Sequence, residues 1–124
     1  MDIEGAEYEA FDEIFEHSNN ITGIAIEIHI DNLARTIKAV DLLSALDKDF
    51  LLLHVHGNNY SRRYFGYFTT KNSIGNIPRN LELTYINKNL VTNYHLAKNQ
   101  SHTTYMDMPN KPNVKDAEFE ILLK

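Results

Sequence analysis

The chain has 124 residues, with 17 acidic and 12 basic side chains and no cysteine. That length fits a single domain, and 43% hydrophobic residues suffice for a buried core, which excludes a wholly disordered protein. The absence of cysteine excludes disulfides, thiolate catalysis and cysteine-ligated metal sites. A net charge of -5 argues against non-specific nucleic-acid binding, which needs a surplus of Lys and Arg.

The N-terminal segment 1–9 is acidic and lacks the basic and then apolar order of a signal peptide. The longest apolar runs, 21–30 and 50–55, are interrupted by Glu27 and His54 and are far shorter than the roughly 20 residues of a bilayer span. We therefore expect a cytoplasmic protein without membrane contact.

The first predicted elements are a helix over residues 5–17 and a strand over 21–30. The helix is indicated by the spacing of Tyr8, Phe11 and Phe15. In the strand, isoleucines line one face and mostly small residues the other, which predicts a strand buried between two layers.

A second helix is predicted over residues 32–46, with Asp31 as its N-cap. Its expected buried stripe consists of Leu33, Ile37, Val40, Leu43 and Leu46. A second apolar strand follows at 50–55, ended by the turn residues 57–59. Strand, helix and strand with short connections form a βαβ unit, so we expect the two strands to be parallel.

The second half of the chain gives weaker signals. The segment 60–80 is rich in aromatic side chains, which suit a lid, a patch of core or a stacking surface for a ring-shaped ligand. Residues 81–86 alternate apolar and polar, which predicts a half-exposed strand added antiparallel to the sheet. The polar segment 87–124 ends in an apolar stretch around 119–122, expected to pack as a strand or tail. The whole chain is predicted to form one α/β domain.

Charged side chains recur in pairs at the ends of the predicted strands. In an open α/β sheet, ligands bind at the carboxyl ends of the strands, and residues two apart leave the same face. Three pairs meet this description: Asp2 with Glu4, Glu27 with His29, and His54 with His56. We therefore expect three carboxylates and three imidazoles to share one crevice.

That grouping suits two kinds of chemistry. One is general acid–base catalysis, in which a His or Glu takes a proton from a substrate hydroxyl. The other is a divalent metal held by carboxylates and imidazoles, but the spacing matches no dedicated ligand motif, so no metal is assigned. A third interpretation is structural, with each His capping its strand and the acids solvated.

Several segments also resemble a known family. Residues 1–9, MDIEGAEYE, resemble the D-(I/V)-E-G-A-E-Y-E signature of the FkbM family of S-adenosylmethionine-dependent methyltransferases. Residues 26–29 (IEIH) resemble the family's next strand, and residues 54–59 (HVHGNN) resemble the strand end that follows. Residues 78–85 (PRNLELTY) resemble its late antiparallel strand, and residues 107–113 (DMPNKPN) resemble its closing D-x-P-N segment. The resemblance thus covers almost the whole chain.

The resemblance implies a partial Rossmann-like methyltransferase sheet with parallel strands, a late antiparallel strand and flanking helices. In the family, the first motif marks the end of the fourth of seven strands. The glycine-rich turn and the acidic residue that hold the cofactor precede it, and this sequence contains no G-x-G. The chain therefore resembles the C-terminal half of such a domain, and we expect it to bind S-adenosylmethionine weakly when isolated.

By resemblance, the reaction is methyl transfer to a hydroxyl of a sugar or another small metabolite. The implied roles are cofactor binding for Asp2 and Glu4, orientation or deprotonation of the acceptor for Glu27, His29, His54 and His56, and substrate contact for Asn58 and Asn59. The expected partners are the small-molecule acceptor and a complementary N-terminal half. The alternative is a non-catalytic remnant or interaction module that dimerises or docks through an exposed strand edge.

Overall fold

The computed structural model describes residues 1–4, 6–60, 66–70, 73–95 and 107–116. Within these ranges the elements are, in chain order, α1 (Glu7–Glu16), a 3-10 turn (Ser18–Asn20), β1 (Gly23–His29), α2 (Leu33–Asp49), β2 (Phe50–Gly57), β3 (Gly66–Thr70), β4 (Ser73–Ile77), β5 (Asn80–Asn87) and a second 3-10 turn (Lys88–Leu90). The mixed α/β class predicted from the sequence is confirmed.

The main sheet has three strands in the order β1-β5-β2, and both outer strands are antiparallel to the central β5. The late antiparallel strand predicted at 81–86 is therefore confirmed. The outer strands β1 and β2 point in the same direction, because each opposes β5. They are nevertheless not neighbours, so the described strands contain none of the parallel pairs expected from the βαβ pattern.

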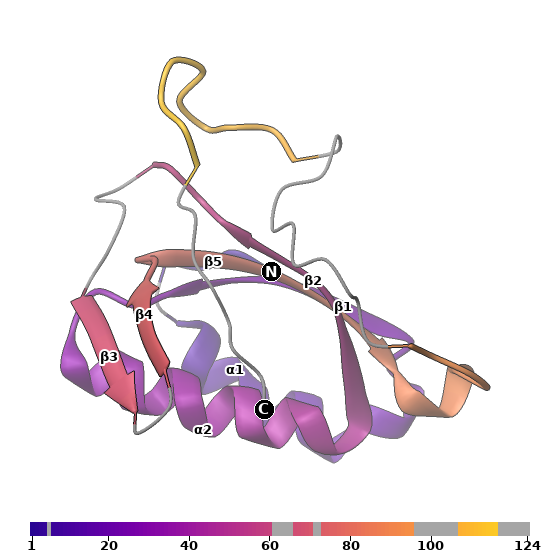
Figure 1. Cartoon of the computed structure of the whole chain (residues 1–124). Helices are drawn as coiled ribbons and strands as arrows, with labels where there is room; N and C mark the ends of the chain where they lie inside the picture. Colours follow the sequence, from indigo (N-terminus) through magenta and orange to yellow (C-terminus); the bar gives the residue numbers. More distant parts are fainter. Residues whose placement is uncertain (5, 61–65, 71–72, 96–106, 117–124) are drawn as a thin grey trace.

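Both helices cover one face of this sheet, and segment 107–116 lies on its other side (Figure 1). The core between sheet and helices is formed by Phe11, Ile24, Ile26, Ile28, Ile30, Ala39, Leu42, Leu46, Phe50, Leu81, Leu83 and Tyr85. The isoleucine face of β1 is buried as expected. Its opposite face is not, because Ala25 is exposed and Glu27 and His29 are only partly buried. The prediction that this strand is buried between two layers is wrong, since among the described residues helices pack on one of its faces only.

Helix α2 differs from its prediction in its cap and in its buried face. Its N-cap is Asn32, whose side-chain oxygen accepts from the Arg35 backbone N–H at 2.9 Å, and not Asp31. Its buried residues are Ala39, Leu42 and Leu46. The helix is therefore rotated away from the predicted orientation, so that Leu46 is the only fully buried member of the expected stripe.

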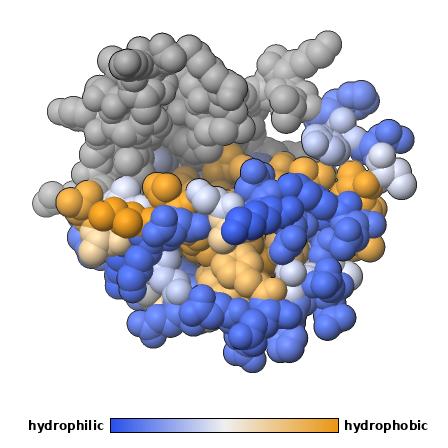
Figure 2. Space-filling model, turned by 90° about the horizontal axis from the view of Figure 1, so that it is seen from below, coloured by the Kyte–Doolittle hydropathy of each residue, from blue (hydrophilic) through white to orange (hydrophobic). Residues whose placement is uncertain are grey.

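The first three members of that stripe face outward. Leu33, Ile37 and Val40 are 70%, 56% and 58% exposed. Figure 2 views the molecule from this helical side and shows hydrophobic surface bordered by hydrophilic residues. The physical reason for the error is that an alternative set of residues, Ala39, Leu42 and Leu46, makes an equally regular apolar face.

Strands β3 and β4 form a two-stranded antiparallel hairpin that the sequence did not predict. The apolar stretch 119–122 and most aromatic side chains of segment 60–80 lie outside the residues whose placement is described. Among the described residues, neither helix is long and apolar enough to cross a membrane.

Candidate functional site

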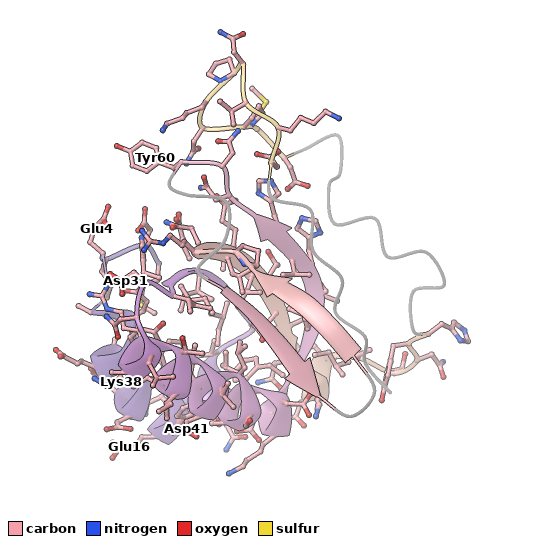
Figure 3. All side chains as sticks on the ribbon, turned by 60° about the vertical axis from the view of Figure 1, so that its left-hand side comes forward. Glu4, Glu16, Asp31, Lys38, Asp41 and Tyr60 are labelled. Carbon is pink, nitrogen blue, oxygen red and sulfur yellow. The ribbon has the colours of Figure 1, made fainter. Side chains whose placement is uncertain are left out.

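A polar pocket opens where β1 ends. It has a volume of about 360 Å³ and is lined mainly by charged and amide side chains, namely Asp2, Glu4, Glu27, His29, Asp31, Arg35, Tyr60, Arg79, Asn80 and Asn110. Figure 3 shows Tyr60, Glu4 and Asp31 along one side of the molecule, with Lys38 and Asp41 of α2 farther along toward the helices. The pocket unites two of the three predicted pairs, Asp2 with Glu4 and Glu27 with His29.

The first turn of α1 positions His29. Its ring Nδ1 lies 2.6 Å from Oε1 of Glu7, and its backbone N–H donates to the same oxygen at 3.1 Å. The Tyr8 hydroxyl donates to the His29 carbonyl at 2.9 Å. Burial, with the neighbouring Glu7 charge, raises the pKa of Tyr8 to about 12, so this hydroxyl remains a donor at neutral pH.

Glu27 reaches the same pocket from the other side of the imidazole. Its Oε1 accepts from the Asn80 side-chain amide at 2.6 Å and lies 3.7 Å from Nε2 of His29. Burial raises the pKa of Glu27, and the nearby Asp2 charge acts in the same direction, while the Asn80 hydrogen bond opposes them. A carboxylate in such surroundings is a better proton acceptor than one in water.

The segment 1–4 brings two further carboxylates to this edge of the pocket. Glu4 has a φ of 56°, in the left-handed region, and its Oε2 lies 3.6 Å from Nε2 of His29. Donor atoms of Asp2, Glu4 and His29 all fall within 4.8 Å of one another. A divalent cation would be chemically compatible with this set, but both carboxylate side chains are exposed, and exposed acids commonly gather without a metal.

His54 lies on a neighbouring hollow of about 280 Å³, which it shares with Asp2 and Glu27 among other residues. Its Nε2 is 3.0 Å from Oδ1 of Asp107, in the segment that resembles the family's closing motif. His54 is thus adjacent to the main pocket and does not line it.

His56 is buried, with 2% of its side chain exposed, and lines neither of these hollows. Its Nδ1 is 3.1 Å from Oε2 of Glu82, and its Nε2 makes an ion-pair contact of 3.2 Å with Oδ2 of Asp116. Burial opposes the charged imidazole, but the two carboxylates outweigh it and raise the pKa of His56. The single crevice expected for all three pairs is therefore divided.

Asn58 and Asn59 are both buried and bond to the protein itself. The Asn58 amide donates to Glu82 at 2.6 Å, and the Asn59 amide donates to the carbonyls of Lys111 and Val114 at 3.1 and 2.6 Å. The Lys111 backbone N–H donates back to Asn59 at 2.9 Å. Asn59 therefore holds segment 107–116 against the end of β2.

Sequence reasoning did not identify the partners of Glu27, His29 and His56. Glu7, Asn80, Glu82 and Asp116 had no assigned role, although each contacts a predicted site residue. Glu82 could have been found only by knowing that β5 lies between β1 and β2, because it then stands opposite both Glu27 and His56. The alternation along 81–86 did place its side chain on the polar face.

The described pocket does not fit the whole of the cofactor that the resemblance implies. Its lining is dominated by charged and amide groups, and its one aromatic ring, Tyr60, is 63% exposed. An adenine ring is normally enclosed by apolar side chains, which the described lining of this pocket lacks. Comparisons with protein-family models, curated proteins and solved structures gave no match for this chain.

Proposed function

We propose that this chain supplies the acceptor-binding side of an FkbM-like, S-adenosylmethionine-dependent O-methyltransferase. The observation that carries the proposal is the pocket at the end of β1, where Glu27 and His29 face Asp2 and Glu4 from the signature segment. Both residues that the resemblance assigns to the cofactor and two of the four that it assigns to catalysis are thus neighbours, although they come from separate parts of the chain.

The arrangement of the strands supports a Rossmann-like sheet as the origin of this fold. Met1 donates from its amino group to the Ala25 carbonyl at 2.5 Å and accepts from the Glu27 backbone N–H at 2.8 Å. Hydrogen bonds to the residues on either side of Ile26 follow the slanted pattern of a parallel neighbour. The resemblance predicts such a parallel strand end beside β1, and it also predicts the late antiparallel strand β5.

The pocket suits a small acceptor that carries several hydroxyls. Carboxylates and amides along its wall accept and donate the hydrogen bonds that fix a polyhydroxylated molecule. Oε1 of Glu27 and Nε2 of His29 lie 3.7 Å apart, so one hydroxyl placed between them can contact both. One of these two atoms would take the hydroxyl proton, and S-adenosylmethionine held mainly by the complementary half would supply the methyl group.

The described part of this chain does not supply a complete binding site for the cofactor. The described lining of the pocket forms no enclosed apolar slot, and the sequence lacks the glycine-rich turn. We therefore propose that a complementary N-terminal half provides most of the S-adenosylmethionine site. The coding DNA before Met1, translated in all three frames, should encode a glycine-rich strand–turn–helix segment. Its absence would favour an independent module.

Activity in the completed enzyme tests the catalytic assignment. With the complementary half supplied, Glu27→Gln and His29→Asn should each lower kcat by about 10²- to 10⁴-fold, the usual contribution of a general base. The matched control is His95→Asn, because this described histidine is exposed and lies outside the pocket lining. Unchanged turnover in both variants would contradict the proposal.

A second candidate function is a non-catalytic docking module. Among the described strands, β2 pairs only with β5, and its Leu52 and Leu53 are 42% and 62% exposed. A free strand edge with apolar side chains favours pairing with another chain. Size-exclusion chromatography with light scattering distinguishes a monomer from a dimer. A monomer at high protein concentration would count against dimerisation through this edge.

A further inference from the structure

We propose that Glu7 is a positioning residue that fixes the tautomer of His29, keeping the proton on Nδ1 and the lone pair of Nε2 toward the pocket. Glu7 lies in the first turn of α1 and is completely buried. Its role in catalysis rests on the proposed function, but the tautomer itself can be measured without any activity.

The contacts of Glu7 determine which ring nitrogen carries the proton. One oxygen, Oε1, accepts the His29 backbone N–H at 3.1 Å and lies 2.6 Å from Nδ1. Because Oε1 already accepts the His29 backbone N–H, it serves as an acceptor toward this residue, and the proton of the contact with Nδ1 is assigned to the ring. The short distance is typical of a charge-assisted hydrogen bond.

Among the described residues, the other ring nitrogen has no hydrogen bond that would compete. Nε2 lies 3.6 Å from Glu4 and 3.7 Å from Glu27, beyond the 2.7–3.2 Å range of N–H···O hydrogen bonds. With Nδ1 occupied by Glu7, the neutral ring presents an unprotonated Nε2 to the pocket. An acceptor hydroxyl would meet a proton acceptor there.

The surroundings of Glu7 favour this role over a chance contact. A buried carboxylate is costly unless it is compensated, and its position in the first turn of α1 places it at the positive end of the helix dipole. The same turn contributes Tyr8, whose hydroxyl bonds the His29 carbonyl at 2.9 Å. Helix α1 thus holds both the backbone and the ring of His29.

The test is the nitrogen chemical shifts of the His29 ring, measured by NMR on the labelled 124-residue chain at a pH where the ring is neutral. In the wild type we expect a protonated Nδ1 and an unprotonated Nε2. In Glu7→Met, which keeps the side-chain length but removes the acceptor, the ring should move to the Nε2-protonated form that free histidine favours. Glu7→Gln keeps an acceptor oxygen without the charge and should give a mixture.

The matched control is Glu9→Met, since Glu9 lies in the same turn of α1 but is exposed. It should leave the His29 shifts unchanged. A wild-type ring protonated on Nε2 would overturn the proposal, even if the Glu7 variants fail to fold. So would a Glu7→Met ring that keeps its proton on Nδ1.

A second measurement separates this inference from the proposed function. In the completed enzyme, Glu7→Met should lower kcat by about 10-fold or more with little change in KM, because it alters the base and not the acceptor contacts. If the tautomer depends on Glu7 and no methyl transfer is found, the positioning holds and the proposed function fails. Methyl transfer with kcat independent of Glu7 would overturn its catalytic role.

Discussion

The two histidines at the ends of β1 and β2 have the same sequence setting and opposite surroundings. Each follows an ionisable residue by two positions, as Glu27 with His29 and His54 with His56. His29 keeps one ring nitrogen toward a pocket, whereas both ring nitrogens of His56 face carboxylates within 3.2 Å. An imidazole can act on a ligand only where its second ring nitrogen is not already paired with another protein group.

The surroundings of the two histidines differ because a different segment lies next to each strand end. Beside His29, segment 1–4 borders an open pocket. Over the end of β2, segment 107–116 is fastened by Asp107, Asp116 and the amide of Asn59. The proposed function therefore concerns the His29 region, and we expect the His56 region to contribute to stability.

The largest expected effect comes from removing the buried imidazole. His56→Leu should lower the free energy of unfolding by about 3 kcal/mol, because Asp116 and Glu82 lose the imidazole that lies between their carboxylates. Chemical denaturation of the variant and the wild type measures it. His95→Leu serves as the exposed control. A His56→Leu protein with unchanged stability would remove the contrast between the two histidines.

Truncation of Asn59 should cost somewhat less. Asn59→Ala removes three hydrogen bonds to segment 107–116 and should destabilise the protein by about 2 kcal/mol. Asn110→Ala, on an exposed residue of the same segment, provides the control for denaturation measurements. If Asn59→Ala instead weakened binding of an acceptor without loss of stability, the substrate role implied by the resemblance would be favoured.

The charge on His56 should make stability pH-dependent, with an effect smaller than removal of the whole side chain. Its pKa in the folded protein is raised above the ordinary 6.5, so the folded state binds more protons than the unfolded state. This stabilisation is complete below about pH 6.5 and is lost as pH rises through the folded pKa. Urea unfolding should show that the free energy of unfolding falls as the pH rises from about 6.5 through the folded pKa. His56→Gln should make this dependence on pH weaker.

The smallest expected change in the free energy of unfolding concerns the start of α2, which borders the pocket. Asn32→Ala removes the N-cap and should destabilise the protein by about 1 kcal/mol. Asp31→Ala removes a half-exposed ion pair with Arg35 and should cost only a few tenths of a kcal/mol. Thermal unfolding of the two variants checks the order, and the reverse order would restore Asp31 as the cap.

Local patterns in the sequence predicted the elements better than their arrangement. The spacing of Phe11 and Phe15 located α1, and the alternating isoleucines located β1, because these periods follow from backbone geometry. The face of α2 was predicted incorrectly, since two apolar stripes compete and only the contact with the sheet selects one. The hairpin β3–β4 gave no clear signal.

The candidate site shows the same division. Pairs of ionisable residues at strand ends were evident from the sequence, and four of the six line one pocket. Their partners were not evident, because Glu7 and Asn80 approach His29 and Glu27 from distant parts of the chain. A hydrogen bond between residues 22 positions apart depends on packing and leaves no local pattern.

The sequence by itself therefore determined an α/β domain with a late antiparallel strand and with charged side chains at the ends of its strands. Only the tertiary structure decided that β5 separates β1 from β2, and that His56 is enclosed while His29 stays open to a pocket. The physical reason is that periodicity records which face of an element is apolar. The neighbours of a polar side chain, which set its protonation and its access to ligands, are fixed only when distant segments pack together.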